Sequence, residues 1–363
     1  MRWIAKHFVP FCLIVSCLCA FAQEQGDGIA SGFRRISPEE ETRLRAFLAE
    51  RVPDRLNGEQ LAEHFRQKKD AAMRLGDEGA QESIIRQWMR ALPNTSNPKK
   101  NLAAILRQQQ KYDEAIGLRR EAIELATTMP DKALSRVDLA QDFLAAWRNA
   151  EAQQELNEAR LFIDKLQAST NWSLFDQIYI RRARYSWDIA QSELHQRFGR
   201  WGPAVISASD AVANSRQILR LIESLPRTPL RARELLYVAG NLHGALSRNT
   251  QTLRAAGELG KAEESLKAEI RLSRELELQP INLSYIYSNV ASLRFDQREF
   301  VQSETNVRKA IRVTEALGHE PLYSRRVWWA QKLIAALEGQ QRWADAKAEF
   351  DRLDSLAADD TVL

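Results

Sequence analysis

The chain has 363 residues, of which 28% are charged and 44% hydrophobic, and its formal net charge is +4. This composition argues against a disordered chain, and without a Gly-X-Y period, a sustained heptad or a bilayer-length apolar run it excludes collagen, a coiled-coil rod and a multispan membrane protein. Because Cys12, Cys17 and Cys19 are the only cysteines, a disulfide framework or a cysteine-based zinc site beyond residue 19 is excluded as well.

The first 22 residues have the pattern of a secretory signal peptide. Arg2 and Lys6 give a positive start, residues 8–20 form a short apolar core, and a small-x-small cleavage site ends at Ala22. We therefore expect residues 1–22 to be removed and the mature protein to be exported, either periplasmic, envelope-associated or secreted. A bacterial source is favoured because a secreted chain without disulfides is less usual in eukaryotes.

A second cleavage is possible before Cys17, because residues 14–17 resemble the bacterial lipoprotein box, in which the cysteine becomes lipidated. Pro10 interrupts the apolar core that this cleavage needs, so Ala22 is favoured and membrane attachment is expected only if Cys17 is lipidated. Removal of residues 1–22 leaves 50 basic against 48 acidic residues. The remaining charge of +2 is weak evidence for a nucleic-acid partner, and none is expected.

Beyond the signal, the sequence carries helix signals and almost no strand signal. The glycine-rich segment within 23–36 is expected to be a flexible linker. Ser37 followed by Pro38 is a strong helix start, which predicts an N-terminal capping helix within 37–57. Prolines near helix ends then divide the chain into units of two helices each, and residues 358–363 form an acidic tail.

An internal repeat runs through residues 58–357. Each copy has a short turn followed by a small residue early in its second helix. These anchors are Ala80, Ala115, Ala152, Ala204, Ala262, Ser303 and Ala346. Their spacings are 35, 37, 52, 58, 41 and 43 residues, and the two longest predict first helices that are lengthened near 174–198 and 231–256.

These residues resemble the tetratricopeptide repeat (TPR) family in its longer-helix variety, because only the first two spacings approach the family's period of ~34 residues. The resemblance implies an all-α fold, a right-handed α-solenoid of stacked antiparallel helical hairpins, with about six to seven hairpins. Each hairpin buries its apolar face by stacking on its neighbours. For the two middle units, ordinary helical pairs are the alternative.

The resemblance also implies that the first helices form a concave groove that binds a protein or peptide client. Asn101 and Asn289 are the most suggestive positions, because an amide offers both a donor and an acceptor to a peptide backbone. A solvated polar face is the simpler explanation for every one of these positions. The polar residues that helical phase places in the groove are Lys100, Asn101, Arg107, Glu193, Arg197, Asn241, Arg248, Tyr285, Asn289 and Ser292.

The positions of two pairs of tryptophans can be predicted from the repeat and from helix geometry. Trp201 and Trp343 stand at hairpin turns, where an aromatic ring fills the gap to the next hairpin, so we expect them in the core. Trp328 and Trp329 point about 100° apart on a helix, and one of them is therefore expected to reach a surface. There Trp328 would be a binding anchor, although two partly buried rings are the simpler alternative.

Nothing in the sequence nominates an enzyme, a cofactor or a metal site. The histidines are scattered, and no Gly-x-Ser-x-Gly elbow or phosphate loop is present. The arginine pairs at 119–120, 181–182 and 325–326 are interpreted as solvated faces. The expected function is an exported scaffold that binds a protein in its groove, with possible weak self-association through the C-terminal helix. The alternative is an extracellular glycan-binding or glycan-processing protein that uses surface tryptophans.

Overall fold

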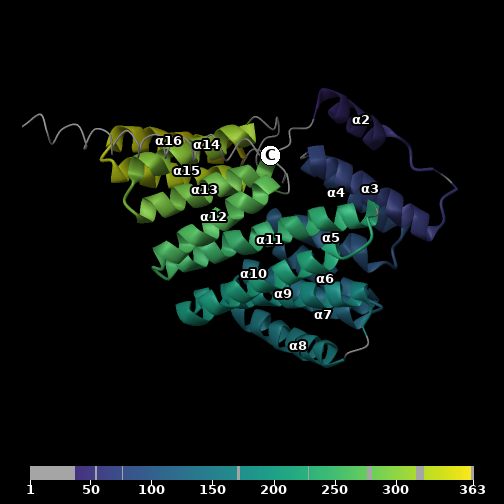
Figure 1. Cartoon of the computed structure of the whole chain (residues 1–363). Coiled ribbons are helices and arrows are strands. Elements are labelled where there is room, and N and C mark those ends of the chain that lie inside the picture. Colours follow the sequence, from purple (N-terminus) through teal and green to yellow (C-terminus); the bar gives the residue numbers. More distant parts are fainter. Residues whose placement is uncertain are drawn as a thin grey trace, which may run out of the picture. The chain divides into compact units, whose positions relative to one another are not determined.

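The computed structural model describes residues 37–360, except 54, 76, 170–171, 228, 276–279 and 316–322. The described residues form fifteen helices, α2 to α16, and no strand (Figure 1). The predicted all-α fold class is therefore confirmed. The expected signal peptide, the linker and Cys17 lie outside the described residues.

Helix α2 (Pro38–Ala49) begins where the sequence indicates, since Ser37 Oγ accepts a hydrogen bond from the Glu40 N–H at 3.1 Å. It ends well before residue 57, and Lys68 Nζ donates to the carbonyl oxygen of Leu48 near its C-terminus at 3.1 Å. A cation at the carboxyl end of a helix satisfies carbonyl groups that have no partner within the helix.

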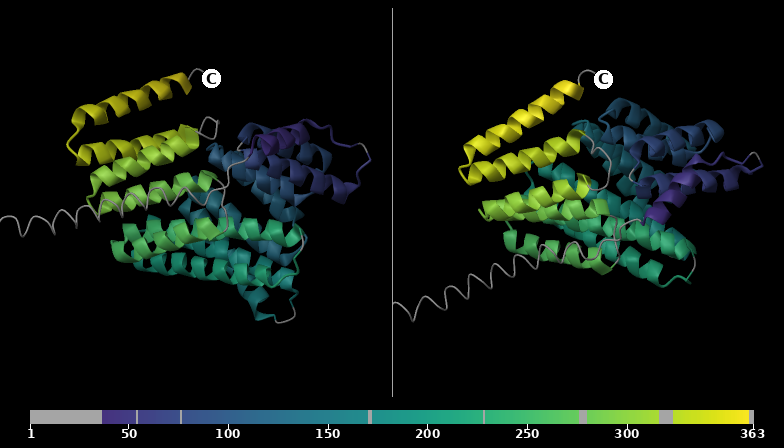
Figure 2. Two further views of the ribbon diagram at one scale, coloured as in Figure 1. Left: turned by 45° about the horizontal axis from the view of Figure 1, so that its top comes forward. Right: turned by 90° about the horizontal axis from the view of Figure 1, so that it is seen from above.

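The remaining helices pair as antiparallel hairpins (Figures 1 and 2). The pairs are α3 (Gly58–Leu75) with α4 (Glu78–Ala91), α5 (Ser96–Gln108) with α6 (Tyr112–Leu125), α7 (Met129–Ala145) with α8 (Asn149–Ala168), α9 (Leu174–Arg197) with α10 (Trp201–Glu223), α11 (Pro229–Ala255) with α12 (Leu259–Glu275), α13 (Pro280–Asp296) with α14 (Phe300–Glu315), and α15 (Tyr323–Gly339) with α16 (Trp343–Asp360). Helices α9 and α11 have 24 and 27 residues against 13 in α5, so the predicted lengthening of these two first helices is confirmed.

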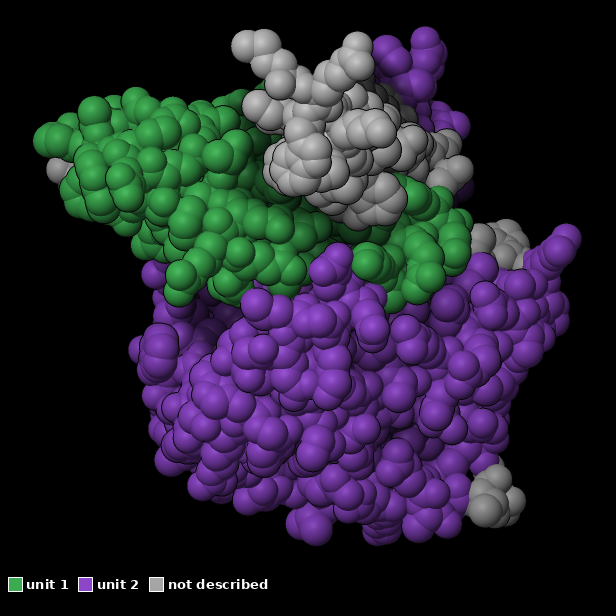
Figure 3. Space-filling model, turned by 60° about the vertical axis from the view of Figure 1, so that its left-hand side comes forward, with its two compact units in different colours: residues 1–35, 266–363 green, residues 36–265 purple. Residues whose placement is uncertain are grey.

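The chain divides into two compact units, coloured separately in Figure 3. Unit 2 comprises residues 36–265, from α2 to the first turns of α12. Unit 1 comprises residues 1–35 and 266–363, of which the structure describes the rest of α12 and helices α13–α16. Within each unit, hairpins stack on the hairpins that follow them in sequence, as a helical repeat requires.

One turn recurs inside six of the hairpins. In the first of them, the Lys111 N–H bonds back to the Leu106 carbonyl oxygen at 2.8 Å, the hydrogen bond of a Schellman motif. The residue before it has a left-handed backbone, and this residue is Gln110, Trp147, Gly199, Gly257, Arg298 or Gln341, with φ between 60° and 80°. The predicted anchors stand five residues later at Ala115, Ala152, Ala204, Ala262, Ser303 and Ala346, each at most 4% exposed.

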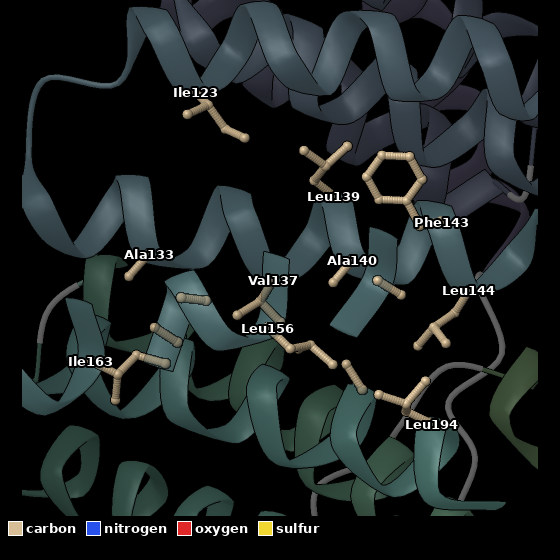
Figure 4. Close-up of a cluster of buried hydrophobic side chains, with 14 of the residues drawn as sticks. Ile123, Ala133, Val137, Leu139, Ala140, Phe143, Leu144, Leu156, Ile163 and Leu194 are labelled. Carbon is tan, nitrogen blue, oxygen red and sulfur yellow. The ribbon is translucent and has the colours of Figure 1, made fainter. Parts of the chain in front are cut away.

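Helix α7 shows why the hairpins must stack. Leu139 and Phe143 point toward α6, whereas Val137 lies on the side that faces Leu156 and Ile163 of α8 (Figure 4). None of these side chains is more than 1% exposed, and full burial of a side chain of this size contributes about 1.5–3 kcal/mol. A helix that is apolar on two sides is stable only when a neighbouring helix covers each side. Each hairpin therefore needs the next one to cover its apolar surface.

The prediction that Trp201 and Trp343 lie in the core is wrong, because they are 39% and 63% exposed. Phe300 occupies the same turn position and is half-buried, with its ring 5.4 Å from that of Phe295. Its ring also lies against Gly339 of the next hairpin. An aromatic ring at the turn is covered where the neighbouring helix leaves space for it, and Gly339 leaves that space because it has no side chain.

We expect Gly339→Ala to destabilise unit 1 by about 1–3 kcal/mol, the usual cost of overpacking. A Cβ atom at this position would lie 2.4 Å from a ring carbon of Phe300. Hydrogen exchange of the α14 and α15 amides measures the effect. Gly117→Ala in α6 is the control, because its Cβ would meet nothing within 4 Å and alanine favours helix by about 1 kcal/mol. Stabilisation by both substitutions would contradict the close contact.

Candidate functional site

Polar pairs join the first helices of successive hairpins in unit 2. Lys100 of α5 binds Asp131 of α7 at 2.5 Å. Further along the same two helices, Arg107 donates to Gln141 Oε1 at 3.1 Å and lies 3.4 Å from Asp142 Oδ1. Two of the predicted binding residues therefore both contact α7 on the first-helix face, defined here as the row of α5, α7, α9 and α11.

The same kind of bridge joins α9 to α11. The Tyr185 hydroxyl donates to the backbone carbonyl of Asn241 at 3.0 Å. Glu193 of α9 accepts from Arg197 at 2.9 Å and lies 3.4 Å from Arg248 of α11. These bridges hold the first helices in a fixed register, and they leave the predicted polar residues already paired within the chain.

Exposed aromatic rings occur on these helices in the tyrosine–arginine cluster, formed by Tyr179, Arg182, Glu234 and Tyr237. Arg182 is 7% exposed and forms an ion pair with Glu234. Its guanidinium carbon lies 5.4 Å from the ring centroid of Tyr179 and 4.5 Å from that of Tyr237. The two rings are 44% and 52% exposed, so a buried cation orients two aromatic rings that solvent can reach.

The sequence pattern does not reveal this cluster, and the prediction that Arg182 lies on a solvated face is wrong. Arg119 is misplaced in the same way, since it is 2% exposed. The acid that pairs with Arg182 is 52 residues away, so no local pattern reveals it. The spacing of these residues is a signal that points to the cluster. Tyr179 and Arg182 are three positions apart, as are Glu234 and Tyr237, and residues three apart are neighbours on a helix surface.

Comparison with known proteins gives structural neighbours only. No family model and no curated protein matches the chain. A crystal structure of a Rap protein complexed with competence and sporulation factor matches with a TM-score of 0.53 at 11% identity, over 88% of this chain and 80% of that chain. The apo form of RapI matches with a TM-score of 0.44 at 12% identity, over 82% and 77%. A tetratricopeptide repeat protein from Parabacteroides merdae matches with a TM-score of 0.34 at 14% identity, over 76% and 98%.

The chain has a TPR-like fold. The recurring turn with its buried anchor and the likeness to the Rap protein both support this fold, which confirms the predicted resemblance. At 11% identity the likeness shows the fold alone, so the chemistry of the face has to be derived from this chain's own residues.

The TPR-like array buries part of the predicted groove. Asn289 is 2% exposed, and its amide donates to both carboxylate oxygens of Glu269 at 3.3 and 3.2 Å. Ser292 is 6% exposed and donates to the Ser288 carbonyl at 2.9 Å. The prediction that these side chains face a partner is therefore wrong. All of residues 286–293 are buried, so α13 has no solvent-facing side over these two turns.

The other predicted positions are partly accessible. Asn101 is half-buried, and its amide donates to the Asn97 carbonyl at 2.7 Å. Tyr285 of α13 is also half-buried. Trp328 is half-buried under Lys332, whose Nζ lies 4.4 Å from the ring centroid, whereas Trp329 is 2% exposed. Of the two adjacent tryptophans, one therefore reaches the surface in part, and its role as a binding anchor stays a prediction.

Two other kinds of site, a metal site and a membrane-spanning helix, are absent from the described ranges. No group of three or more histidine, cysteine, aspartate or glutamate side chains is arranged to hold a metal ion there. None of the helices in the same ranges combines the length and the apolar character needed to cross a bilayer.

Proposed function

We propose that this chain is an exported, non-enzymatic scaffold that binds another protein or peptide on the first-helix face of unit 2. The observation that carries the proposal is the tyrosine–arginine cluster. Tyrosine rings supply a large amphipathic contact area and lose little conformational entropy on binding. Because Arg182 already fixes Tyr179 and Tyr237, a partner would order little more of the scaffold when it binds.

Two further observations support this proposal. The bridges between α5, α7, α9 and α11 give the face a rigid register, which suits an extended ligand. The Rap protein of similar fold is described as a complex with competence and sporulation factor, so the fold is compatible with a bound partner. Export is proposed from the signal-peptide pattern of residues 1–22.

The test is crosslinking and capture of partners from the cell envelope of the source organism. We expect Tyr237→Ala to reduce capture at least tenfold, the effect of about 1.4 kcal/mol that is typical of an aromatic binding residue. Ile206→Ala is the matched control, because Ile206 is 63% exposed on the second helix α10. Equal capture by the wild type and both variants would rule out this face.

Export has its own measurement. The intact mass of the native protein should correspond to a chain that begins at residue 23. A mass that begins at Cys17 and includes a diacylglycerol would show lipidation instead. An uncleaved chain in the cytoplasmic fraction would contradict export without affecting the binding proposal.

Two tryptophans, Trp172 and Trp328, give the glycan alternative no support. Trp172 is half-buried against the core cluster of α7, α8 and α9, and its indole N–H donates to the Leu166 carbonyl at 2.7 Å. Trp328 is half-buried with Lys332 over its ring. Contacts within the protein therefore account for the position of both rings, and neither requires a sugar ligand.

A further inference from the structure

Trp147 is an outlier among the six recurring turns. It stands at the left-handed position with φ 61°, and its side chain is 76% exposed. A left-handed backbone crowds the Cβ atom against the carbonyl group, so glycine or a small polar residue is favoured there. The five equivalent positions are occupied by Gln110, Gly199, Gly257, Arg298 and Gln341. The fold therefore does not require tryptophan at this turn.

The indole ring lies under an arginine of the next hairpin. The guanidinium carbon of Arg197 is 4.4 Å from the Trp147 ring centroid. Arg197 is fixed in turn by Glu193 at 2.9 Å and by Asn149 Oδ1 at 3.4 Å. This contact orients the ring while most of its surface stays open to solvent, and an oriented, exposed tryptophan is a typical anchor of protein interfaces.

A second aromatic residue extends the same edge. Phe198 follows Arg197 directly and is 50% exposed, and the guanidinium carbon of Arg200 lies 5.5 Å from its ring centroid. We name these residues, Trp147, Arg197, Phe198 and Arg200, the Trp147 edge. Each of its two exposed rings lies beside an arginine, so the edge offers both apolar and cationic groups.

Positive charge exceeds negative charge at this edge. Glu193 is shared between Arg197 and Arg248, and Arg200 has no carboxylate within ion-pair distance among the described residues. Burial lowers the pKa of His195, and the nearby positive charge of Arg200 lowers it further. Four arginines, at 148, 197, 200 and 248, therefore stand against three acids, at 113, 151 and 193. This leaves one positive charge in excess, on Arg200, which suits a partner carrying carboxylates.

We propose that the Trp147 edge docks an acidic segment of the partner protein, with an apolar or aromatic side chain on Trp147 and a carboxylate on Arg200. This inference rests on the proposed function and specifies the chemistry of the partner. It places the anchor at the turn end of unit 2, on residues distinct from the tyrosine–arginine cluster.

The surroundings favour a peptide over a nucleic acid. Arg148, next to Trp147, is paired with Glu151 at 2.8 Å and lies 3.6 Å from Asp113. Carboxylates interspersed among the arginines repel the phosphate groups of a nucleic acid, whose backbone binds to a continuous basic stripe. The excess of positive charge is confined to a small part of the surface, so it matches a few carboxylates and not a long row of phosphates.

The test uses the full-length mature protein and a panel of fluorescent synthetic peptides. In these peptides one leucine, phenylalanine or tryptophan is flanked by glutamates. The same peptides with lysines in place of the glutamates, and an oligothymidylate, serve as comparison probes. We expect the acidic peptides to bind, and added salt to weaken their binding. Tighter binding of the oligothymidylate or of the basic peptides, or no binding of any acidic peptide, overturns the proposal.

Trp147→Gly separates binding from folding. We expect it to weaken binding of the acidic peptides at least about tenfold, while the Tm stays unchanged or rises because glycine relieves the left-handed strain. Arg200→Gln should weaken the same binding, and Arg45→Gln in α2 should not. Unchanged peptide affinity in Trp147→Gly overturns the inference, as does a fall in Tm, which would show that the indole serves the fold.

The two proposals fail in distinguishable ways. If Tyr237→Ala loses native partners but Trp147→Gly retains them and the acidic peptides, the inference is wrong and the proposed function stands. If Trp147→Gly loses the acidic peptides and Tyr237→Ala loses nothing, the edge is a docking site and the first-helix face is not.

Discussion

Arg119→Met is expected to destabilise unit 2 by about 3–5 kcal/mol, the usual cost of removing one partner from a buried ion pair. Arg119 is 2% exposed, and its Nε donates to Asp142 Oδ2 at 3.1 Å while another guanidinium nitrogen donates to Asp138 at 3.0 Å. Asp142 is completely buried. Burial raises the pKa of Asp142 even though Arg119 and Arg107 lower it, so this carboxyl group is costly to leave without Arg119.

A double substitution tests the interpretation. Arg119→Met combined with Asp142→Leu should recover most of the lost stability, because an apolar pair removes both buried charges. Urea unfolding followed by hydrogen exchange of the α6 and α7 amides measures the change in unit 2. Arg45→Met is the control, since its ion pair with Glu41 is exposed and pairs of this kind contribute about 0–1 kcal/mol. If the double variant is less stable than Arg119→Met alone, the loss of stability does not come from leaving the buried Asp142 carboxyl group unpaired.

The register of the repeat was predictable because it depends on local geometry. A small residue is needed where the two helices of a hairpin cross, and the position of that crossing is fixed by the turn before it. Ala115 and Ala204 therefore occupy the same place relative to their turns, although one first helix has 13 residues and the other 24. The length of the first helix changes the period of the repeat without moving the anchor.

Exposure of polar residues was less predictable, because it depends on distant partners. The polar phase of its helix predicts Asn289 in the groove, but α13 is buried on all sides over residues 286–293. Serine and asparagine are small enough to be buried when hydrogen-bonded, so they give the helix a polar face that is not a solvent face. Arg182 illustrates the same point, since its burial depends on Glu234 of another hairpin.

The turn aromatics show a third limit of sequence patterns. Phe300, Trp201 and Trp343 have the same position in their turns, yet only the phenylalanine is covered closely by its neighbour. Whether a ring is covered depends on a residue of the next hairpin, such as Gly339. The sequence pattern also does not predict that Trp147 is exposed. Trp147 stands at the left-handed position of its turn, and that backbone conformation depends on the turn and not on the type of residue.

Glu269→Gln is expected to change the pH dependence of unit 1. Glu269 is completely buried, and burial raises its pKa from 4.5 to about 8 despite the hydrogen bond from Asn289. Between these two values the folded state binds a proton that the unfolded state releases. The stability that Glu269 contributes in the wild type is therefore fully present below pH 4.5 and falls by about 1.4 kcal/mol per pH unit up to pH 8, about 5 kcal/mol in all.

The glutamine variant keeps a neutral side chain at every pH, so it should match the wild type near pH 4.5 and exceed it by several kcal/mol at pH 8. Hydrogen exchange of the α13 and α14 amides across this range measures the difference. Glu275→Gln is the control, because Glu275 is exposed on the same helix. Burial would raise the pKa of Glu304, but hydrogen bonds from Gln340 and Arg308 lower it, so its titration falls below this window. Parallel pH profiles for wild type and Glu269→Gln would mean that Glu269 is ionised in the folded protein.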